Sequence, residues 1–213
     1  MGNFITFEGI EGSGKSTQIR LLLEHLKGRG VDVRMTREPG GTIIGEKVRG
    51  ILLDPSTRGL IPRAELFLYA AARLQHIDEI IQPALDEGKV VLCDRFTDAT
   101  VAYQGYARGI PLNEVKVVNS LVTVDLRPDL TILLDLPVEM GLTRARERNL
   151  SDASSATSRF EEEDLVFHQR VREGYLEIAA SERNRVKIIP ADQPVEKVAR
   201  QVQKVVARHL KLD

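Results

Sequence analysis

The sequence is poor in the residue types that mark secreted and nucleic-acid-binding proteins. It has one cysteine, Cys93, no tryptophan and a net charge of −1. A single cysteine excludes a disulfide within the chain, so a reducing compartment is the simplest expectation. Balanced charge gives no overall basic field toward nucleic acid or an anionic membrane. Cys93 follows three apolar residues, which favours a buried, inert thiol over a nucleophile.

Long apolar runs are also lacking. No stretch approaches the roughly 20 apolar residues that a membrane-spanning helix needs. Residues Met1 to Thr6 lack the basic flank and the apolar run of a signal peptide. We therefore expect a cytoplasmic protein without a membrane or nucleic-acid partner. The four histidines have no metal-like clustering, so we expect ordinary polar or core roles for them.

Short apolar runs are present, and their length predicts strands. The chain has 213 residues, which is the size of a single α/β domain spanning 1–213. Runs that are too short for helices and nearly continuous in apolar character are typical of strands buried on both faces of a parallel sheet. They are Phe4–Phe7, Val31–Thr36, Val90–Asp94, Leu130–Leu136 and Val186–Ile189.

Segments with helical spacing separate these runs. The first contains Ile19, Leu22 and Leu26 and ends at Gly28, a normal stop signal. Strands alternating with helices predict a doubly wound five-stranded parallel sheet flanked by helices, with ligands at the carboxyl ends of the strands. The other expected helices are Gly45–Leu53, Arg63–Ile81, Leu112–Val124, Val138–Arg148, Glu161–Ser181 and Val195–Leu210.

A glycine-rich motif after the first strand predicts a triphosphate site. In the pattern G-x-x-x-x-G-K-[ST], backbone N–H groups cradle phosphate oxygens, and the following helix adds its positive end. Lys15 can reach the β- and γ-phosphates of ATP, and the Ser16 hydroxyl is suited to Mg²⁺. A turn that only packs strand against helix is the alternative, and the flanking elements disfavour it. The motif comprises Gly9, Ile10, Glu11, Gly12, Ser13, Gly14, Lys15, Ser16 and Thr17.

The rest of the chain narrows the class of nucleotide-binding protein. A GTPase is expected to carry Asn-Lys-x-Asp after a later strand, and the sequence has no such run. A motor or helicase needs a nucleic-acid or partner surface, for which the charge balance gives no support. A small-molecule kinase needs a triphosphate cradle, an acceptor pocket and cations that cover the moving phosphoryl group. The sequence offers candidates for all three.

Five further motifs resemble the bacterial thymidylate kinase family. They follow one another in the family's order as far as about Arg185. The resemblance implies a P-loop kinase fold and the reaction of ATP with dTMP to give ADP and dTDP, with Mg²⁺. It also implies a homodimer, for which the Arg63–Ile81 helix is a candidate interface. The motifs are Phe7–Gly12, Thr36–Thr42, Tyr69–Arg73, Asp94–Phe96 with Ala102–Gly105, and Arg127–Leu130.

Asp94 and Arg95 close a strand at the edge of the sheet where a ligand is expected. A guanidinium there offers a fork that matches phosphate oxygens. The resemblance implies that Arg95 binds the acceptor phosphate and that Asp94 serves the Mg²⁺ and phosphate region. A structural ion pair at a strand end is the alternative.

The acceptor residues come mainly from the resemblance. Tyr69 and Arg73 share a helix face, and an aromatic at that spacing is ordinarily core. The resemblance implies that Tyr69 stacks on thymine, that Arg73 bonds a base carbonyl, and that Arg49 contacts the acceptor phosphate. Glu38 and Pro39 would form the loop beside the acceptor, although a purely structural turn explains them as well. The remaining positions implied are Thr100 at the thymine ring, Tyr103 near the sugar, and Gln104.

A basic segment near residue 150 predicts a small lid at about 143–160. Arg144, Arg146, Arg148 and Arg159 bracket a soft loop, Leu150–Ser158. A solvated basic helix face is the alternative. The resemblance implies a catalytic arginine in either the P-loop or the lid, and Glu11 at the P-loop position favours the lid. Arg148 or Arg159 would then carry that role, and Glu11 or Glu8 would hold Mg²⁺ through water.

Two other functions stay open from the sequence alone. One is another nucleoside or nucleoside monophosphate kinase of the same fold, which differs only in the acceptor pocket. The other is a non-catalytic protein whose partner surface is gated by ATP. A pure switch needs no acceptor-phosphate site, so Asp94–Arg95 and the lid arginines argue against it.

Overall fold

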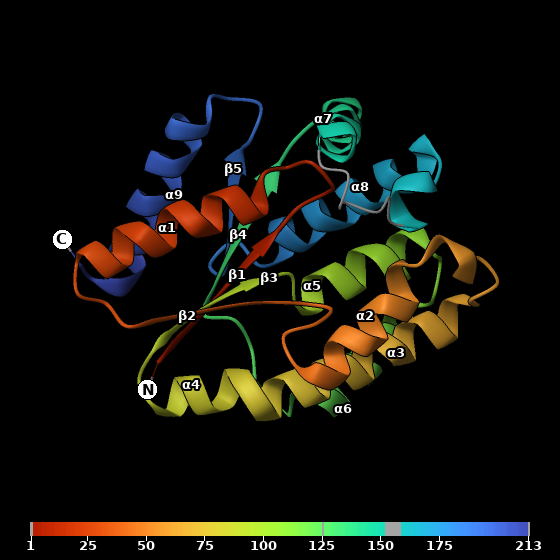
Figure 1. The fold of residues 1–213 in the computed structure, drawn as a ribbon, viewed down its shortest axis with the longest axis horizontal. Helices are drawn as coiled ribbons and strands as arrows, with labels where there is room; N and C mark the ends of the chain where they lie inside the picture. The colour runs from red at the N-terminus through yellow and green to blue at the C-terminus, as the bar shows by residue number, and fades with distance from the viewer. Residues whose placement is uncertain (1, 125, 152–158, 213) are drawn as a thin grey trace.

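A computed structural model describes residues 2–124, 126–151 and 159–212, with the side chains of 149–151 left out. Five strands form one parallel sheet in the order β2-β3-β1-β4-β5 (Figure 1). Every strand starts and ends within two residues of its predicted bounds, which confirms the predicted five-stranded parallel sheet. The strands are β1 (Asn3–Glu8), β2 (Val33–Arg37), β3 (Val90–Asp94), β4 (Leu130–Asp135) and β5 (Val186–Pro190).

Helices cover both faces of the sheet. α1 packs with α9 on one face, and α8 packs with η3 on the other. The α-helices are α1 (Lys15–Gly28), α2 (Ile43–Leu53), α3 (Pro62–His76), α4 (Gln82–Asp86), α5 (Thr97–Thr100), α6 (Leu112–Thr123), α7 (Val138–Ser151), α8 (Leu165–Ser181) and α9 (Val195–Leu210). Shorter helical segments are η1 (Pro55–Thr57), η2 (Ile77–Ile81), η3 (Val101–Ala107) and η4 (Arg159–Glu162).

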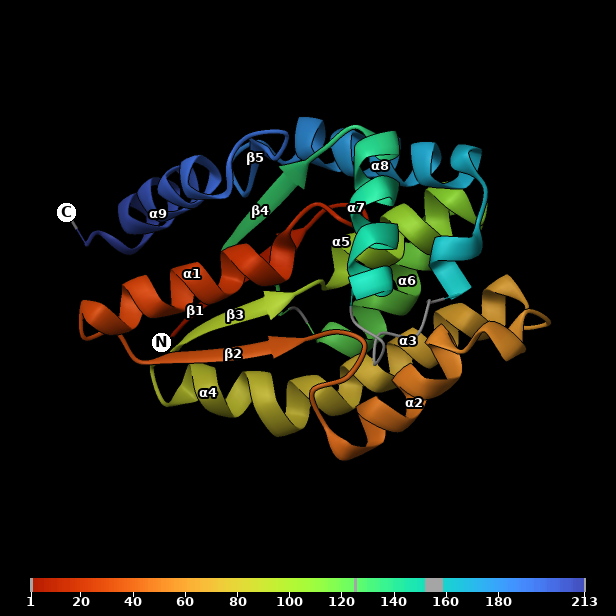
Figure 2. The same ribbon diagram turned by 45° about the horizontal axis from the view of Figure 1, so that its top comes forward.

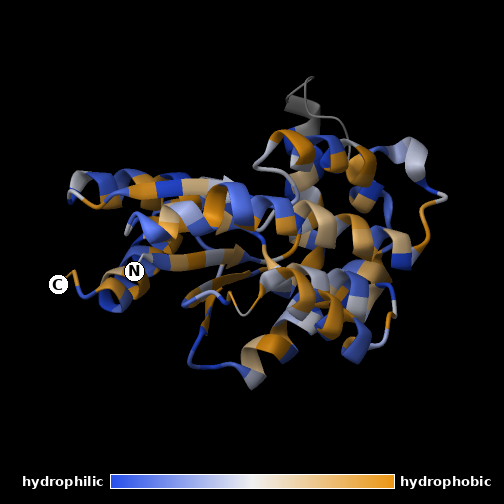
Figure 3. Cartoon of the chain, turned by 90° about the horizontal axis from the view of Figure 1, so that it is seen from below, coloured by the Kyte–Doolittle hydropathy of each residue, from blue (hydrophilic) through white to orange (hydrophobic). Residues whose placement is uncertain are grey.

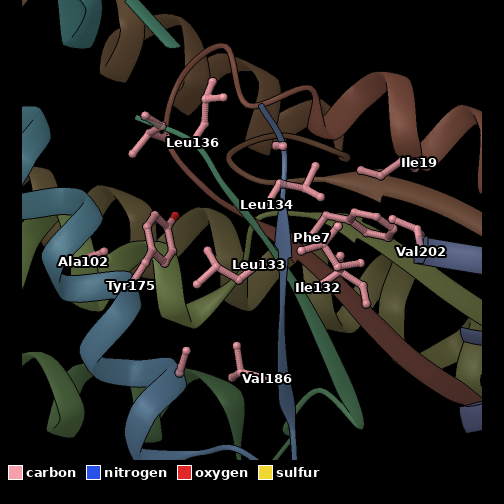
Figure 4. Close-up of a cluster of buried hydrophobic side chains, with 14 of the residues drawn as sticks. Phe7, Ile19, Ala102, Ile132, Leu133, Leu134, Leu136, Tyr175, Val186 and Val202 are labelled. Carbon is pink, nitrogen blue, oxygen red and sulfur yellow. The ribbon is translucent and has the colours of Figure 1, made fainter. Parts of the chain in front are cut away.

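The core lies on both sides of β4, whose side chains alternate between the two helical layers. Ile132 points toward α1 and α9, where Ile19 lies (Figure 4). Leu133 points to the opposite side, toward Tyr175 of α8. Ile132 and Leu133 are almost fully buried. A strand in this position therefore has to be apolar at every residue, which is why its sequence does not alternate.

Three helical segments differ from the sequence prediction. The expected Arg63–Ile81 helix starts at Pro62, passes through the π-turn η2 and continues as α4 to Asp86. The helical stretch Thr97–Ala107 was not predicted, because it begins inside a functional motif and lacks a clear apolar period. The helix expected at Glu161–Ser181 is α8, which begins at Leu165. The Asp164 carboxylate caps it there by accepting a hydrogen bond from the backbone N–H of Phe167.

The topology brings the candidate site residues together at one end of the sheet. Figure 2 shows β2 and β3 pointing toward the side where α2, α3 and α7 lie. The predicted lid at about 143–160 includes residues 152–158, which lie outside the described residues. Its described parts are the carboxyl-terminal turns of α7 and the segment η4. Within the described ranges, no helix is both long and apolar enough to cross a bilayer.

Candidate active site

Two cavities meet at the carboxyl ends of the strands. The larger, of about 720 Å³, lies between the P-loop and the segment Ala191–Val195 that follows β5. The smaller, of about 430 Å³, lies between the P-loop, α3 and the start of η3. Gly12, Lys15, Ser16 and Arg148 line both cavities. A group held at this junction contacts ligands in both cavities, which is the arrangement that a transfer reaction between two bound molecules needs.

The P-loop conformation depends on its glycines. Gly12 has a φ of 69°, and a Cβ at this position would come within 2.0 Å of the carbonyl oxygen of Gly141 in α7. Gly14 has a φ of 90° and precedes the first residue of α1. The positive end of the α1 dipole therefore faces the larger cavity.

Lys15 is folded back over its own loop. Its ammonium group donates hydrogen bonds to the carbonyl oxygens of Gly9, at 3.0 Å, and Ile10, at 2.9 Å. Burial, followed by the nearby charge of Arg95, lowers the pKa of Lys15 to about 8. A phosphate bound in either cavity would stabilise the charged form of the Lys15 ammonium group, because an opposite charge nearby raises its pKa again.

Ser16 and Asp94 bring a hydroxyl and a carboxylate oxygen together where the two cavities meet. The Ser16 hydroxyl donates to Oδ2 of Asp94 at 2.9 Å. A hydroxyl and a carboxylate are ligands that suit Mg²⁺, which favours oxygen donors and keeps several waters. No group of three or more acidic, histidine or cysteine side chains that could hold a metal occurs among the described residues. The hydroxyl of Ser16 and the carboxylate of Asp94 fit a Mg²⁺ ion that arrives with a triphosphate.

Arg95 is held at the floor of the smaller cavity. Its φ of 72° turns the backbone sharply after β3. Nη1 donates to the Tyr175 hydroxyl at 2.9 Å, and Nη2 donates to Oε1 of Glu11 at 3.2 Å. The guanidinium also lies 4.9 Å from the centre of the Tyr103 ring. These contacts fix the direction of a charged fork that lines the cavity.

A buried carboxylate lies behind Arg95. Glu8 accepts hydrogen bonds from the Tyr175 hydroxyl, at 2.8 Å, and from the backbone N–H of Phe96, at 2.7 Å. Burial, with the charge of Asp98 adding to it, raises the pKa of Glu8 to about 8. The sequence does not indicate a role for Tyr175 at this site, because its spacing on α8 is that of an ordinary core residue. Nothing local in the sequence indicates that its hydroxyl reaches Arg95.

The carboxylate of Glu11 accepts hydrogen bonds from other side chains of the protein. The Tyr103 hydroxyl lies 2.7 and 2.8 Å from its two carboxylate oxygens, and His168 Nδ1 lies 3.5 Å from Oε2. Burial pushes the pKa of Glu11 upward, but His168, Arg95 and Lys15 outweigh it and hold the pKa well below its usual range. A carboxylate in this position faces the smaller cavity as a charged hydrogen-bond acceptor.

All nine residues predicted for the acceptor line the smaller cavity. Arg73 is the most constrained of them, with Nε donating to Oε2 of Glu38 at 2.7 Å and Nη2 donating to the Thr100 hydroxyl at 2.9 Å. Asn119 accepts from Nη1 at 2.9 Å, a contact that the sequence did not indicate. The nine are Glu38, Pro39, Arg49, Tyr69, Arg73, Arg95, Thr100, Tyr103 and Gln104.

The two candidate lid arginines lie in different surroundings. Arg148, in α7, lines both cavities and donates to Oε1 of Glu161 at 2.9 Å. Arg159 is 5% exposed and donates to the carboxylate of Glu65 at 2.6 Å. The sequence could not separate the two arginines, because both flank the same soft loop. Their surroundings favour Arg148 as the residue that reaches a phosphoryl group.

The comparison with known families agrees with this geometry. The model of the family described as thymidylate kinase matches residues 7–202 of the chain. The chain belongs to the thymidylate kinase family. The resemblance noted in the sequence motifs is thereby confirmed, and so are the fold class and the enzyme class.

Individual relatives match over almost the whole chain. A thymidylate kinase of Syntrophotalea carbinolica is 52% identical over 95% of this chain and 94% of its own length. A thymidylate kinase of Geotalea daltonii is 55% identical over 92% of both chains. The crystal structure of a thymidylate kinase from Ehrlichia chaffeensis superimposes with a TM-score of 0.76 at 38% identity, covering 96% of this chain and 98% of that one.

Family membership decides between the functions that the sequence left open. Thymidylate kinases are nucleoside monophosphate kinases that use ATP as phosphate donor with Mg²⁺. The chain therefore has the function of a thymidylate kinase. Another nucleoside or nucleoside monophosphate kinase and a non-catalytic, ATP-gated interaction protein are both excluded. Lys15, Ser16 and Asp94 have the chemistry that this donor and this ion require.

Proposed function

We propose that the chain transfers the γ-phosphoryl group of ATP to dTMP, with ATP in the larger cavity and dTMP in the smaller one. The observation that carries this assignment is the junction of the two cavities at Lys15, Ser16 and Arg148. Residues Gly9–Thr17 hold the triphosphate through backbone N–H groups and the positive end of α1. When bound, Mg²⁺ neutralises phosphate charge, and Ser16 with Asp94 is the pair that would hold it.

The smaller cavity presents one feature to each part of dTMP. Arg95 receives the 5′-phosphate, because its fork is fixed by Tyr175 and Glu11. Tyr69 stacks on the base, while Arg73 and Thr100 bond its edge. Tyr103 and Glu11 lie at the sugar. The acceptor phosphate is itself anionic, so the chain needs no strong base and catalyses by positioning and electrostatics.

Arg148 acts as the catalytic arginine in this proposal. It lies at the junction of the cavities, where charge develops as the phosphoryl group moves. Glu161 holds its guanidinium from the far side of the predicted lid at about 143–160. In this proposal, residues 1–213 form one kinase domain that includes this lid.

The chain also forms a homodimer through α3 and α6 in this proposal. Both helices present large apolar side chains to solvent. Phe67 is 60% exposed and Leu121 is 73% exposed. Leu74 and Val117 are exposed as well. Figure 3 shows orange, apolar positions interspersed with blue, hydrophilic ones along the helices. The balanced charge and the buried thiol of Cys93 support the cytoplasm as its location.

The acceptor assignment is tested by ADP release from ATP and Mg²⁺ with a panel of nucleoside monophosphates. Turnover selective for dTMP supports it. Faster turnover with another monophosphate contradicts the roles given to Tyr69, Arg73 and Thr100, while the roles at the P-loop stand.

A further inference from the structure

We propose that Glu65 is a positioning residue that fixes η4 against the wall of the acceptor cavity, so that the affinity for dTMP depends on it. This inference rests on the proposed function, because it takes the smaller cavity as the acceptor site. Glu65 lies in the first turn of α3 and is fully buried. A buried carboxylate is costly unless it is paired and hydrogen-bonded, so its partners indicate what it is for.

Three donors from two other segments converge on this carboxylate. Arg159 of η4 donates to Oε2 at 2.6 Å. Gln104 of η3 donates to Oε1 at 2.7 Å, and Arg108, just after η3, donates to the same oxygen at 3.3 Å. Glu65 therefore joins η4 to η3, the segment that carries Tyr103 and Gln104 into the cavity.

Arg159 is held by more than the ion pair. Its Nε donates to the backbone carbonyl oxygen of Leu52 in α2 at 3.2 Å. Its guanidinium lies 4.9 Å from the centre of the Phe160 ring. The charge of Glu65 thus keeps a buried arginine in place, and the arginine sets the position of the next residue in the chain.

Phe160 closes one side of the acceptor cavity. Its ring is 4% exposed and lies 5.6 Å from the ring of Tyr103 and 6.5 Å from that of Tyr69. The residue after it, Glu161, holds Arg148 at 2.9 Å. A shift of η4 would therefore move the aromatic wall of the base site and the carboxylate that holds Arg148.

Loss of the Glu65 charge should release η4. Without it, the buried guanidinium of Arg159 would be left without its counter-charge, and the side chain would gain by moving toward water. Phe160 would move with it. Affinity for dTMP then falls. The larger cavity shares Arg148, but most of its lining comes from the P-loop, the start of α1 and the segment after β5, so the affinity for ATP is kept.

Steady-state kinetics of the full chain separate this role from simple stabilisation. Glu65→Gln should raise the KM for dTMP about 10- to 100-fold and leave the KM for ATP unchanged. Glu65→Asp keeps the charge and should restore part of the loss. Glu114→Gln is the matched control, since Glu114 forms an exposed ion pair with Arg63 of α3 and should change neither constant. A carboxylate that only stabilised the fold would reduce the active fraction and leave both KM values unchanged, which would overturn the proposal.

Two further measurements keep the proposal testable if Glu65→Gln folds poorly or if dTMP is not the acceptor. Arg159→Met removes the partner charge and should reproduce the rise in KM, with no additional effect in the double variant. Independent of turnover, hydrogen exchange of the backbone amides at Phe160–Glu163 should become faster in Glu65→Gln. Unchanged exchange there would contradict the role of Glu65, whereas absent dTMP turnover in the unmodified protein would contradict only the proposed function.

Discussion

Nη1 of Arg95 donates a 2.9 Å hydrogen bond to the hydroxyl of Tyr175, although 80 positions separate the two residues in the chain. The same hydroxyl donates to the buried carboxylate of Glu8 at 2.8 Å. Arg95 lies at the smaller cavity because Tyr175 of α8 holds it there, and Glu8 of β1 in turn holds Tyr175. The guanidinium proposed to bind the acceptor phosphate is thus positioned by residues that a ligand need not touch.

Tyr175→Phe is expected to lower kcat/KM for dTMP about tenfold, because Arg95 and Glu8 both lose a buried hydrogen-bond partner. The KM for ATP should stay unchanged. Initial-rate kinetics with each substrate varied in turn measure the effect, and Tyr106→Phe in η3 serves as the matched control. An equal loss for both substrates would contradict the positioning of Arg95 by Tyr175.

Arg148→Ala is expected to lower kcat about 1,000-fold, because it removes a cation from the point where charge develops on the moving phosphoryl group. Arg146→Ala, two residues away on an exposed face of α7, should have little effect. Single-turnover rates at saturating ATP and dTMP measure the chemical step. A similar loss of kcat in the two variants would contradict a specific role for Arg148, because it would show that only the positive charge of α7 matters.

Glu8 should lower the free energy of unfolding as pH rises from about 5 to about 8. Burial raises its pKa to about 8 in the folded protein, against about 4.5 in the unfolded chain. Between these values the folded state binds the extra proton, so Glu8 contributes a slope of at most about 1.4 kcal/mol per pH unit. Its contribution is complete below about pH 4.5 and lost above about pH 8.

Glu8→Gln removes that titration and should flatten the slope, as measured by urea denaturation at several pH values. Glu24→Gln, an exposed carboxylate on α1, is the control. Lys15, whose pKa burial lowers to about 8, gives a slope of opposite sign, but only above about pH 8. An unchanged slope in Glu8→Gln between pH 5 and 8 would contradict the protonated state of Glu8.

The exposed apolar side chains of α3 and α6 should form the dimer interface. Combined Phe67→Lys and Leu121→Lys changes are expected to shift the protein from dimer to monomer in sedimentation velocity, because buried charge opposes apolar contact. Val195→Lys on α9 introduces a charge at another exposed apolar residue and should leave the dimer intact. A monomeric unmodified protein would contradict the homodimer.

The sheet and the triphosphate site could be predicted from the sequence because both depend on local patterns. Continuous apolar runs such as Leu130–Leu136 mark buried strands, and the P-loop motif needs only its own backbone. The helical stretch Thr97–Ala107 was not predicted, because several of its residues line the smaller cavity and do not follow a helical apolar pattern. Its tertiary contacts outweigh its weak helix propensity.

The supporting contacts could not be predicted, because they join residues that are distant in the chain. Glu65 and Arg159 are 94 positions apart, and no local pattern links them. The same holds for Asn119 with Arg73, at 46 positions. Single motifs therefore indicated residues that line the smaller cavity, and the folded structure was needed to identify the groups that hold them.

The most direct test of the account is ADP release with ATP, Mg²⁺ and dTMP in Arg95→Ala, compared with Arg34→Ala on the exposed edge strand β2. Arg95→Ala should lower kcat/KM for dTMP roughly 100-fold or more, because the acceptor phosphate loses a charged, two-pronged donor. Arg34→Ala should keep near-normal turnover. Full dTMP turnover in Arg95→Ala would contradict the placement of the acceptor phosphate at Arg95.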